Sequence, residues 1–109
     1  MNFTELLDYL MRNSKYDITD GDAGQTLDAA LTGRHKNPVA GDIIAQLYRN
    51  SRLDSPQQPL ERAQAVTALG PIRLQYMKDD APVEGFRMVE DIVYKIDGAY
   101  NDEILRNKP

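Results

Sequence analysis

The sequence predicts an all-α fold, a compact antiparallel bundle of five to six short helices that forms a single domain over residues 1–109. Apolar residues recur every three to four positions through most of the chain, as on one face of a helix. No segment keeps the alternation of a half-buried strand for more than about four residues. The length suits one domain, because domains usually contain roughly 100–150 residues.

The first predicted helix has the clearest apolar face and begins after Asn2. Its face consists of Phe3, Leu6, Leu7, Leu10 and Met11. Asn2 and Glu5 have the spacing of a capping box, in which each side chain accepts a hydrogen bond from the other residue's backbone N–H. Residues 16–22 predict a loop, and Asp20 or Asp22 is expected to cap the helix that follows it.

The second and third predicted helices are bounded by clear start and stop signals. Gly33 fits the left-handed position that ends the second helix, and Asn37–Pro38 fits the cap and first residue of the third. The apolar face of the second helix is Ala23, Leu27, Ala30 and Leu31. That of the third is Ala40, Ile43, Ile44, Leu47 and Tyr48. Residues 54–59 predict a loop within the domain.

The last two predicted helices are interrupted by glycine and proline. Gly70–Pro71 is expected to break or kink the fourth, because proline cannot form the hydrogen bond back to residue 67. Apolar residues on either side of that break are Ala63, Val66, Leu69, Ile72, Tyr76 and Met77. The final helix follows a turn at 79–82 and is expected to bury Val83, Phe86, Val89, Ile92, Val93 and Ile96. Asp97–Gly98 is expected to interrupt it before Tyr100, Ile104 and Leu105.

Composition excludes several classes of site. The chain has no cysteine and one histidine, His35, which excludes disulfides, thiolate metal sites and His-rich metal sites. No cofactor is therefore predicted. No apolar run approaches the roughly 18 residues of a membrane-spanning helix. Glu5 and Asp8 interrupt the apolar stretch near Met1, which is not typical of a secretory signal, so the expected location is the cytoplasm.

No catalytic arrangement is recognisable in the sequence. His35 stands between Arg34 and Lys36 and is expected to be a solvated residue at a helix end. The serines lie in no triad motif, and the aspartates at 17–28 do not match a calcium loop. Neighbouring carboxylates, as in Glu90–Asp91, point about 100° apart on a helix and do not face each other. The sequence therefore predicts a protein that is not an enzyme.

The predicted function is a small protein-interaction module, an adaptor, inhibitor or regulatory subunit that binds a protein partner or itself as a homodimer. Tyrosine at the edge of an apolar face suits contact surfaces, because its ring can be buried while its hydroxyl stays polar. The expected partner-binding residues are Tyr9, Tyr16, Arg49, Arg52, Tyr94 and Tyr100.

DNA binding is the alternative function. Residues 34–62 carry five basic and three acidic side chains, although the whole chain has a net charge of −4. The turn at 33–37 has a length compatible with a helix-turn-helix, in which the second helix enters the major groove. The alternative is therefore a helix-turn-helix-like regulator that uses segment 34–52. It is less favoured, because nonspecific DNA binding needs a strongly basic face.

Overall fold

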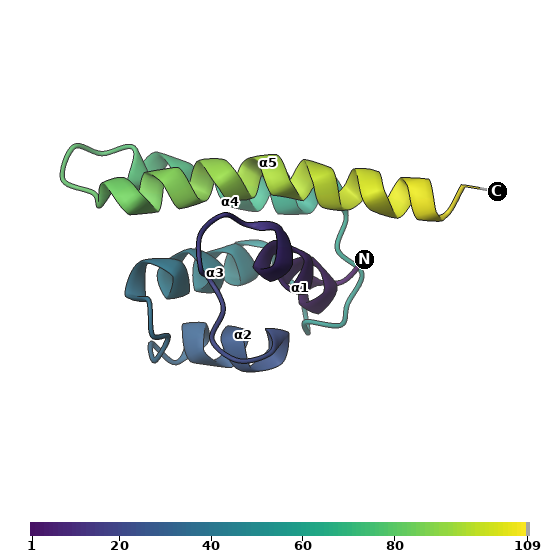
Figure 1. Ribbon diagram of the computed structural model, residues 1–109, viewed down its shortest axis with the longest axis horizontal. Coiled ribbons are helices and arrows are strands. Elements are labelled where there is room, and N and C mark those ends of the chain that lie inside the picture. Colours follow the sequence, from purple (N-terminus) through teal and green to yellow (C-terminus); the bar gives the residue numbers. More distant parts are fainter. Residues whose placement is uncertain (109) are drawn as a thin grey trace.

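The computed structural model describes residues 1–108, which contain five helices and no strand (Figure 1). The helices are α1 (Phe3–Asn13), α2 (Ala23–Leu31), α3 (Pro38–Asn50), α4 (Arg62–Tyr76) and α5 (Val83–Arg106). The all-α class predicted from the sequence is confirmed, and all five helices contribute to one apolar core. None of the helices in residues 1–108 combines the length and apolar character needed to cross a membrane.

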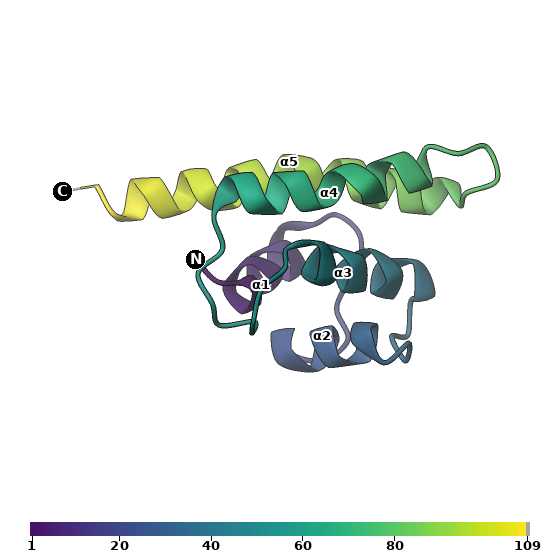
Figure 2. The ribbon, with the colours of Figure 1, turned by 180° about the vertical axis from the view of Figure 1, so that it is seen from behind.

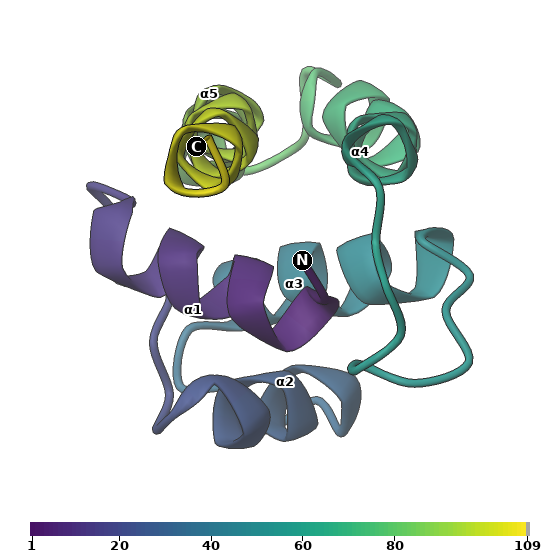
Figure 3. The same ribbon diagram turned by 90° about the vertical axis from the view of Figure 1, so that its right-hand side faces the viewer.

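The helices form three layers. Helices α4 and α5 run antiparallel as a hairpin on one side of the molecule, and α2 lies on the opposite side (Figures 1, 2 and 3). Helices α1 and α3 lie between them: α3 contacts α2, α4 and α5, while α1 contacts α2 and α5. The middle layer is therefore covered on both sides, whereas the hairpin has an outer face that no other helix covers.

The helix starts agree with the predicted caps. The Asn2 side chain accepts a hydrogen bond from the Glu5 N–H at 2.8 Å, and the Glu5 carboxylate accepts one from the Asn2 N–H at 3.0 Å. Asp22 forms the same reciprocal pair with Gln25 at the start of α2. Asn37 caps α3 as predicted, with Pro38 as the first helical residue.

The predicted break of α4 and the predicted interruption of α5 are wrong, because both helices continue through their glycines. Gly70 has no Cβ to collide with the ring of Pro71, so the residue before proline can stay helical. Thr67, whose carbonyl loses its partner at Pro71, is exposed to solvent. Gly98 serves close packing instead, since a Cβ there would lie 3.0 Å from the Tyr9 hydroxyl oxygen.

The hairpin buries different faces from those predicted. Val66, Val83 and Phe86 were expected in the core but are exposed. Small residues face inward in their place and let the helices approach their neighbours closely; Gly85, for example, lies against the ring of Tyr76. The buried residues are Ala65, Ala68, Leu69, Ile72 and Tyr76 of α4, and Gly85, Met88, Val89, Ile92, Ile96, Ala99 and Tyr100 of α5. Large apolar side chains therefore remain on the outside of the hairpin.

Candidate protein interface on the outer face of the hairpin

Eight large apolar side chains lie exposed on the hairpin, two of them (Ile104 and Leu105) near the end of α5, and the other six are called the hairpin face below. They are Val66 (41% exposed), Leu74 (67%), Met77 (58%), Val83 (64%), Phe86 (37%) and Tyr94 (76%). Leu74, Met77 and Phe86 line one hollow, and Phe86 and Tyr94 line a second, so these four side chains lie side by side on the hairpin. Single exposed apolar residues are ordinary in soluble proteins, but a group of this kind is typical of a contact surface.

A shallow hollow lies between α4 and α5 near the turn that joins them. Its apolar lining comes from Gly70, Pro71, Leu74, Met77 and Phe86, and its charged lining from Arg73 and Glu90. The Arg73 guanidinium donates two hydrogen bonds to the Glu90 carboxylate, Nε to Oε1 at 2.7 Å and an Nη to Oε2 at 3.1 Å. This two-bond geometry fixes both side chains. The hollow is therefore apolar, with a charge pair that is already neutralised.

The structure brings together two of the predicted contact residues, Tyr16 and Tyr94. Both line a second shallow hollow beside α5, together with Phe86 and Arg87. Tyr94 is highly exposed and Tyr16 is half-buried. Because Phe86 and Glu90 line both hollows, the two are continuous across α5.

Tyr9, Arg49 and Arg52 lie on separate parts of the surface. Tyr9 lines a hollow between α1 and the end of α5, where charged residues predominate. The Arg49 guanidinium donates a hydrogen bond at 3.3 Å to the carbonyl of Leu31, the last residue of α2. Arg52 follows α3 in a left-handed conformation and borders a hollow next to α4. The structure therefore does not join these three residues to the hairpin face.

Tyr100 is a core residue, which removes it from the candidate contacts. Only 6% of it is exposed, and its hydroxyl donates a hydrogen bond at 2.6 Å to the Leu60 carbonyl. Burial, and then the nearby carboxylates of Glu103 and Glu61, raise the pKa of Tyr100 to about 12. The tyrosine that was expected to bind a partner instead anchors α5 to the segment before α4.

This anchor predicts a loss of stability in alkali. The folded-state pKa of Tyr100 lies above its value of about 10 in the unfolded chain, so its contribution is fully present below pH 10 and is lost as the pH rises through about 12. We expect the free energy of unfolding, measured by urea melts at pH 9 to 12, to fall less steeply with pH in Tyr100→Phe than in the wild type. Equal slopes of the unfolding free energy against pH in the two proteins would contradict the anchoring role of the Tyr100 hydroxyl.

Asp91 holds the segment that carries Tyr16 against α5. Its carboxylate accepts hydrogen bonds from the Ser14 hydroxyl at 2.6 Å, the Lys95 ammonium at 3.1 Å and the Lys15 N–H at 3.3 Å. Burial alone would raise the pKa of Asp91, but the hydrogen bonds from Ser14 and Lys95 outweigh it and lower the pKa overall. Glu90 points to α4 instead, which confirms that these neighbouring carboxylates do not face each other.

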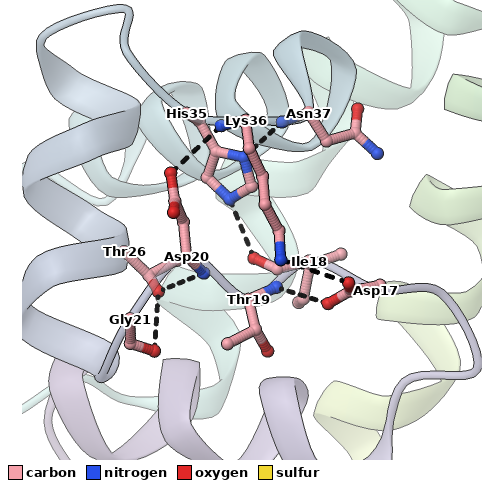
Figure 4. A network of polar contacts seen from close by, with 9 residues as sticks. All are labelled: Asp17, Ile18, Thr19, Asp20, Gly21, Thr26, His35, Lys36 and Asn37. Carbon is pink, nitrogen blue, oxygen red and sulfur yellow. Dashed lines mark hydrogen bonds and ion pairs between the residues drawn. The ribbon is translucent and has the colours of Figure 1, made fainter.

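His35 is buried, so its predicted position as a solvated helix end is wrong (Figure 4). The Asn37 N–H donates to Nδ1 at 2.9 Å, so Nδ1 carries no proton and Nε2 is the protonated nitrogen. Nε2 lies 2.9 Å from the Ile18 carbonyl and donates to it. Both ring nitrogens therefore join backbone groups of the 14–22 and 32–37 loops. Gly41 leaves room for the His35 side chain, since a Cβ at position 41 would lie 2.7 Å from the Cβ of His35.

The basic segment 34–52 does not form a continuous basic surface. The Lys36 ammonium lies 3.4 Å from the Asp17 carboxylate, and Arg49 and Arg52 border different hollows. Helix α3, which would have to read DNA, lies in the middle layer (Figure 3), with Ile43, Ile44 and Leu47 buried.

The residues of the hairpin face that the sequence reasoning missed are Val66, Leu74, Met77, Val83 and Phe86, of which all but Leu74 had been assigned to apolar helix faces. A signal was present in α5, where small residues such as Gly85 and Ala99 follow a helical spacing of their own.

Within residues 1–108 no three His, Asp or Glu side chains are grouped so that they could hold a metal ion. Comparison with known proteins finds no matching family model, curated protein or solved structure.

Proposed function

We propose that this chain is a non-enzymatic protein-interaction module, an adaptor, inhibitor or regulatory subunit, that binds through the hairpin face. The observation that supports the proposal is the exposure of six large apolar side chains on two adjacent helices. Fully burying one such side chain contributes about 1.5–3 kcal/mol. A partner that covered only part of the face would therefore gain several kcal/mol before the costs of association.

The arrangement of the polar residues also supports a role without catalysis. His35 uses both ring nitrogens to join backbone groups, and Asp91 accepts three hydrogen bonds that hold a loop in place. Each of these groups already has structural partners, among them the Ser14 hydroxyl that donates to Asp91 at 2.6 Å. The absence of cysteine suits a reducing compartment, so the cytoplasm is the location that we propose.

DNA binding stays the second candidate and has less support. Its recognition helix would be α3, yet the Asp42 carboxylate on the polar side of α3 accepts hydrogen bonds from the Tyr76 hydroxyl at 2.6 Å and from Gln46 at 2.9 Å. A reading helix needs a free polar face that can enter the major groove. Here that face carries an acidic residue and is tied to α4.

The test compares capture of proteins by two charge-changing variants. Leu74→Glu places a charge in the apolar hollow of the hairpin face, whereas Arg34→Glu changes an exposed residue of the basic segment. We expect the immobilised wild type to capture a protein from a lysate of the source cells, and Leu74→Glu to retain at least about ten-fold less of it. A loss of about 1.4 kcal/mol of binding free energy is enough for a ten-fold weaker affinity. Arg34→Glu is expected to capture as the wild type does.

The reverse result would contradict the proposal. If Arg34→Glu lost its ligand while Leu74→Glu kept it, the basic segment would be the functional surface. A mobility shift on mixed-sequence DNA at low salt, where phosphate contacts are strongest, would then support the DNA-binding alternative. Both substitutions are at exposed positions, so their unfolding midpoints should match the wild type, and circular dichroism checks this.

A further inference from the structure

Three exposed residues of α5 lie close to one line along its length, with a drift of about 20° around the helix at each step, so that Leu105 also borders the hollow that contains Tyr9. Val83, Tyr94 and Leu105 follow each other at intervals of eleven residues and are 64%, 76% and 65% exposed. Eleven residues make about three turns of an α-helix, so each member of the series lies above the previous one after roughly 16 Å. The three apolar residues are therefore evenly spaced along the helix, with Tyr94 at the midpoint.

The two ends of α5 differ in what surrounds them. The last turns project beyond the rest of the molecule (Figure 1), and Ile104 and Leu105 are more than 60% exposed there. The first turns contribute Phe86 to the apolar hollow that also contains Leu74 and Met77. One end of the helix thus presents projecting apolar side chains, and the other end presents a recess.

We infer that the occupant of the hairpin face is a second copy of this chain, packed antiparallel about a two-fold axis beside Tyr94. In such a dimer, positions equally distant from Tyr94 on either side face each other. Val83 then meets Leu105 of the second copy, the two Tyr94 rings meet at the axis, and Ile104 enters the hollow beside Phe86. The inference rests on the proposed function, because it uses the same face.

The available area is sufficient for a stable dimer. From Val83 to Leu105 the helix extends about 33 Å, and two packed helices present a face about 20 Å wide. Because α4 has 15 residues and is only about 22 Å long, this gives roughly 550 Å² per copy, or about 1,100 Å² for both copies, just above the lower limit of about 1,000 Å² in total for a specific interface.

The charges on this face are compatible with burial. Glu90 comes level with Gly98 of the second copy, one residue from Asp97, and Glu90 and Asp97 are already paired with Arg73 and Arg62 of their own hairpins. Apart from Arg87, the charges that the dimer would cover are therefore already paired, and paired charges cost less to bury than isolated ones. Arg87 comes level with Asn101 of the second copy, one residue from Asp102.

Single cysteines test the pairing directly, because the chain has none of its own. Tyr94→Cys should form a disulfide-linked dimer under mild oxidation. Neither Val83→Cys nor Leu105→Cys should cross-link alone, whereas an equimolar mixture of the two should give the mixed dimer. Gln57→Cys, on an exposed loop outside the hairpin, is the control for random oxidation. Efficient cross-linking of Val83→Cys to itself would overturn the antiparallel arrangement.

The mass in solution gives a second readout. Light scattering at about 100 µM should give twice the monomer mass of 12.3 kDa for the wild type, and a shift to the monomer for Leu105→Glu. The inference would be overturned if the wild type were a monomer and the Tyr94→Cys variant formed no disulfide-linked dimer. If that monomer still captured another protein in a way that Leu74→Glu abolished, the proposed function would stand with a different occupant. If it captured nothing, both would fail.

Discussion

Gly85→Ala is expected to lower the free energy of unfolding by about 2 kcal/mol, although alanine favours helices more than glycine does. A Cβ at position 85 would overlap the Tyr76 ring and lie 3.2 Å from Cγ1 of Val39. The ring cannot turn away easily, because its hydroxyl donates a hydrogen bond at 2.6 Å to Asp42. Overpacking of this kind typically costs 1–3 kcal/mol.

Gly24→Ala is the matched control for this prediction. Gly24 also lies in the first turn of a helix, but a Cβ there would meet only an Asp22 carboxylate oxygen at 3.4 Å, which is ordinary contact. We expect its stability to equal or exceed that of the wild type in urea melts followed by circular dichroism. If Gly85→Ala were as stable as Gly24→Ala, this result would contradict the close packing of α5 against α4 near the turn that joins them.

His35→Ala is expected to cost about 3 kcal/mol of stability. The substitution leaves the Asn37 N–H and the Ile18 carbonyl without the partners that they have in the folded protein, and each buried polar group left unsatisfied costs about 1–3 kcal/mol. The removed ring also leaves a void beside Gly41. Thermal and urea melts measure the loss, and hydrogen exchange at the Asn37 amide should become faster.

Arg34→Ala serves as the control, because Arg34 is adjacent to His35 and exposed. Its stability is expected to stay within about 0.5 kcal/mol of the wild type, as for most surface substitutions. Equal stability of His35→Ala and Arg34→Ala would show that the imidazole does not hold the two loops together.

The sequence was sufficient to predict the all-α class and the starts of the first three helices, because these follow from local chemistry. The capping boxes at Asn2 and Asp22 depend only on residues three positions apart. The long apolar face of α1 has one helical phase, and Phe3, Leu6, Leu7 and Leu10 are all buried.

The hairpin face and the role of His35 could not be predicted in this way, because both depend on tertiary contacts. In α5 two apolar series coexist, and the sequence does not show that close packing against Tyr76 favours the series with Gly85. The acceptor for His35 is the Ile18 carbonyl, seventeen residues away, and no local pattern encodes it. Tyr94 is exposed, as expected for a tyrosine at the edge of an apolar helix face, whereas Tyr100 is buried by its tertiary contacts; partner binding by Tyr94 stays a prediction.

The most direct test of the hairpin face as the contact surface is the rate at which maleimide labels Leu74→Cys. We expect labelling in a concentrated lysate of the source cells to be several-fold slower than in dilute buffer, because a partner covers the face. Gln57→Cys should react at similar rates in both. Equal rates for Leu74→Cys in lysate and in buffer would contradict the account, because the face would then be uncovered where the protein acts.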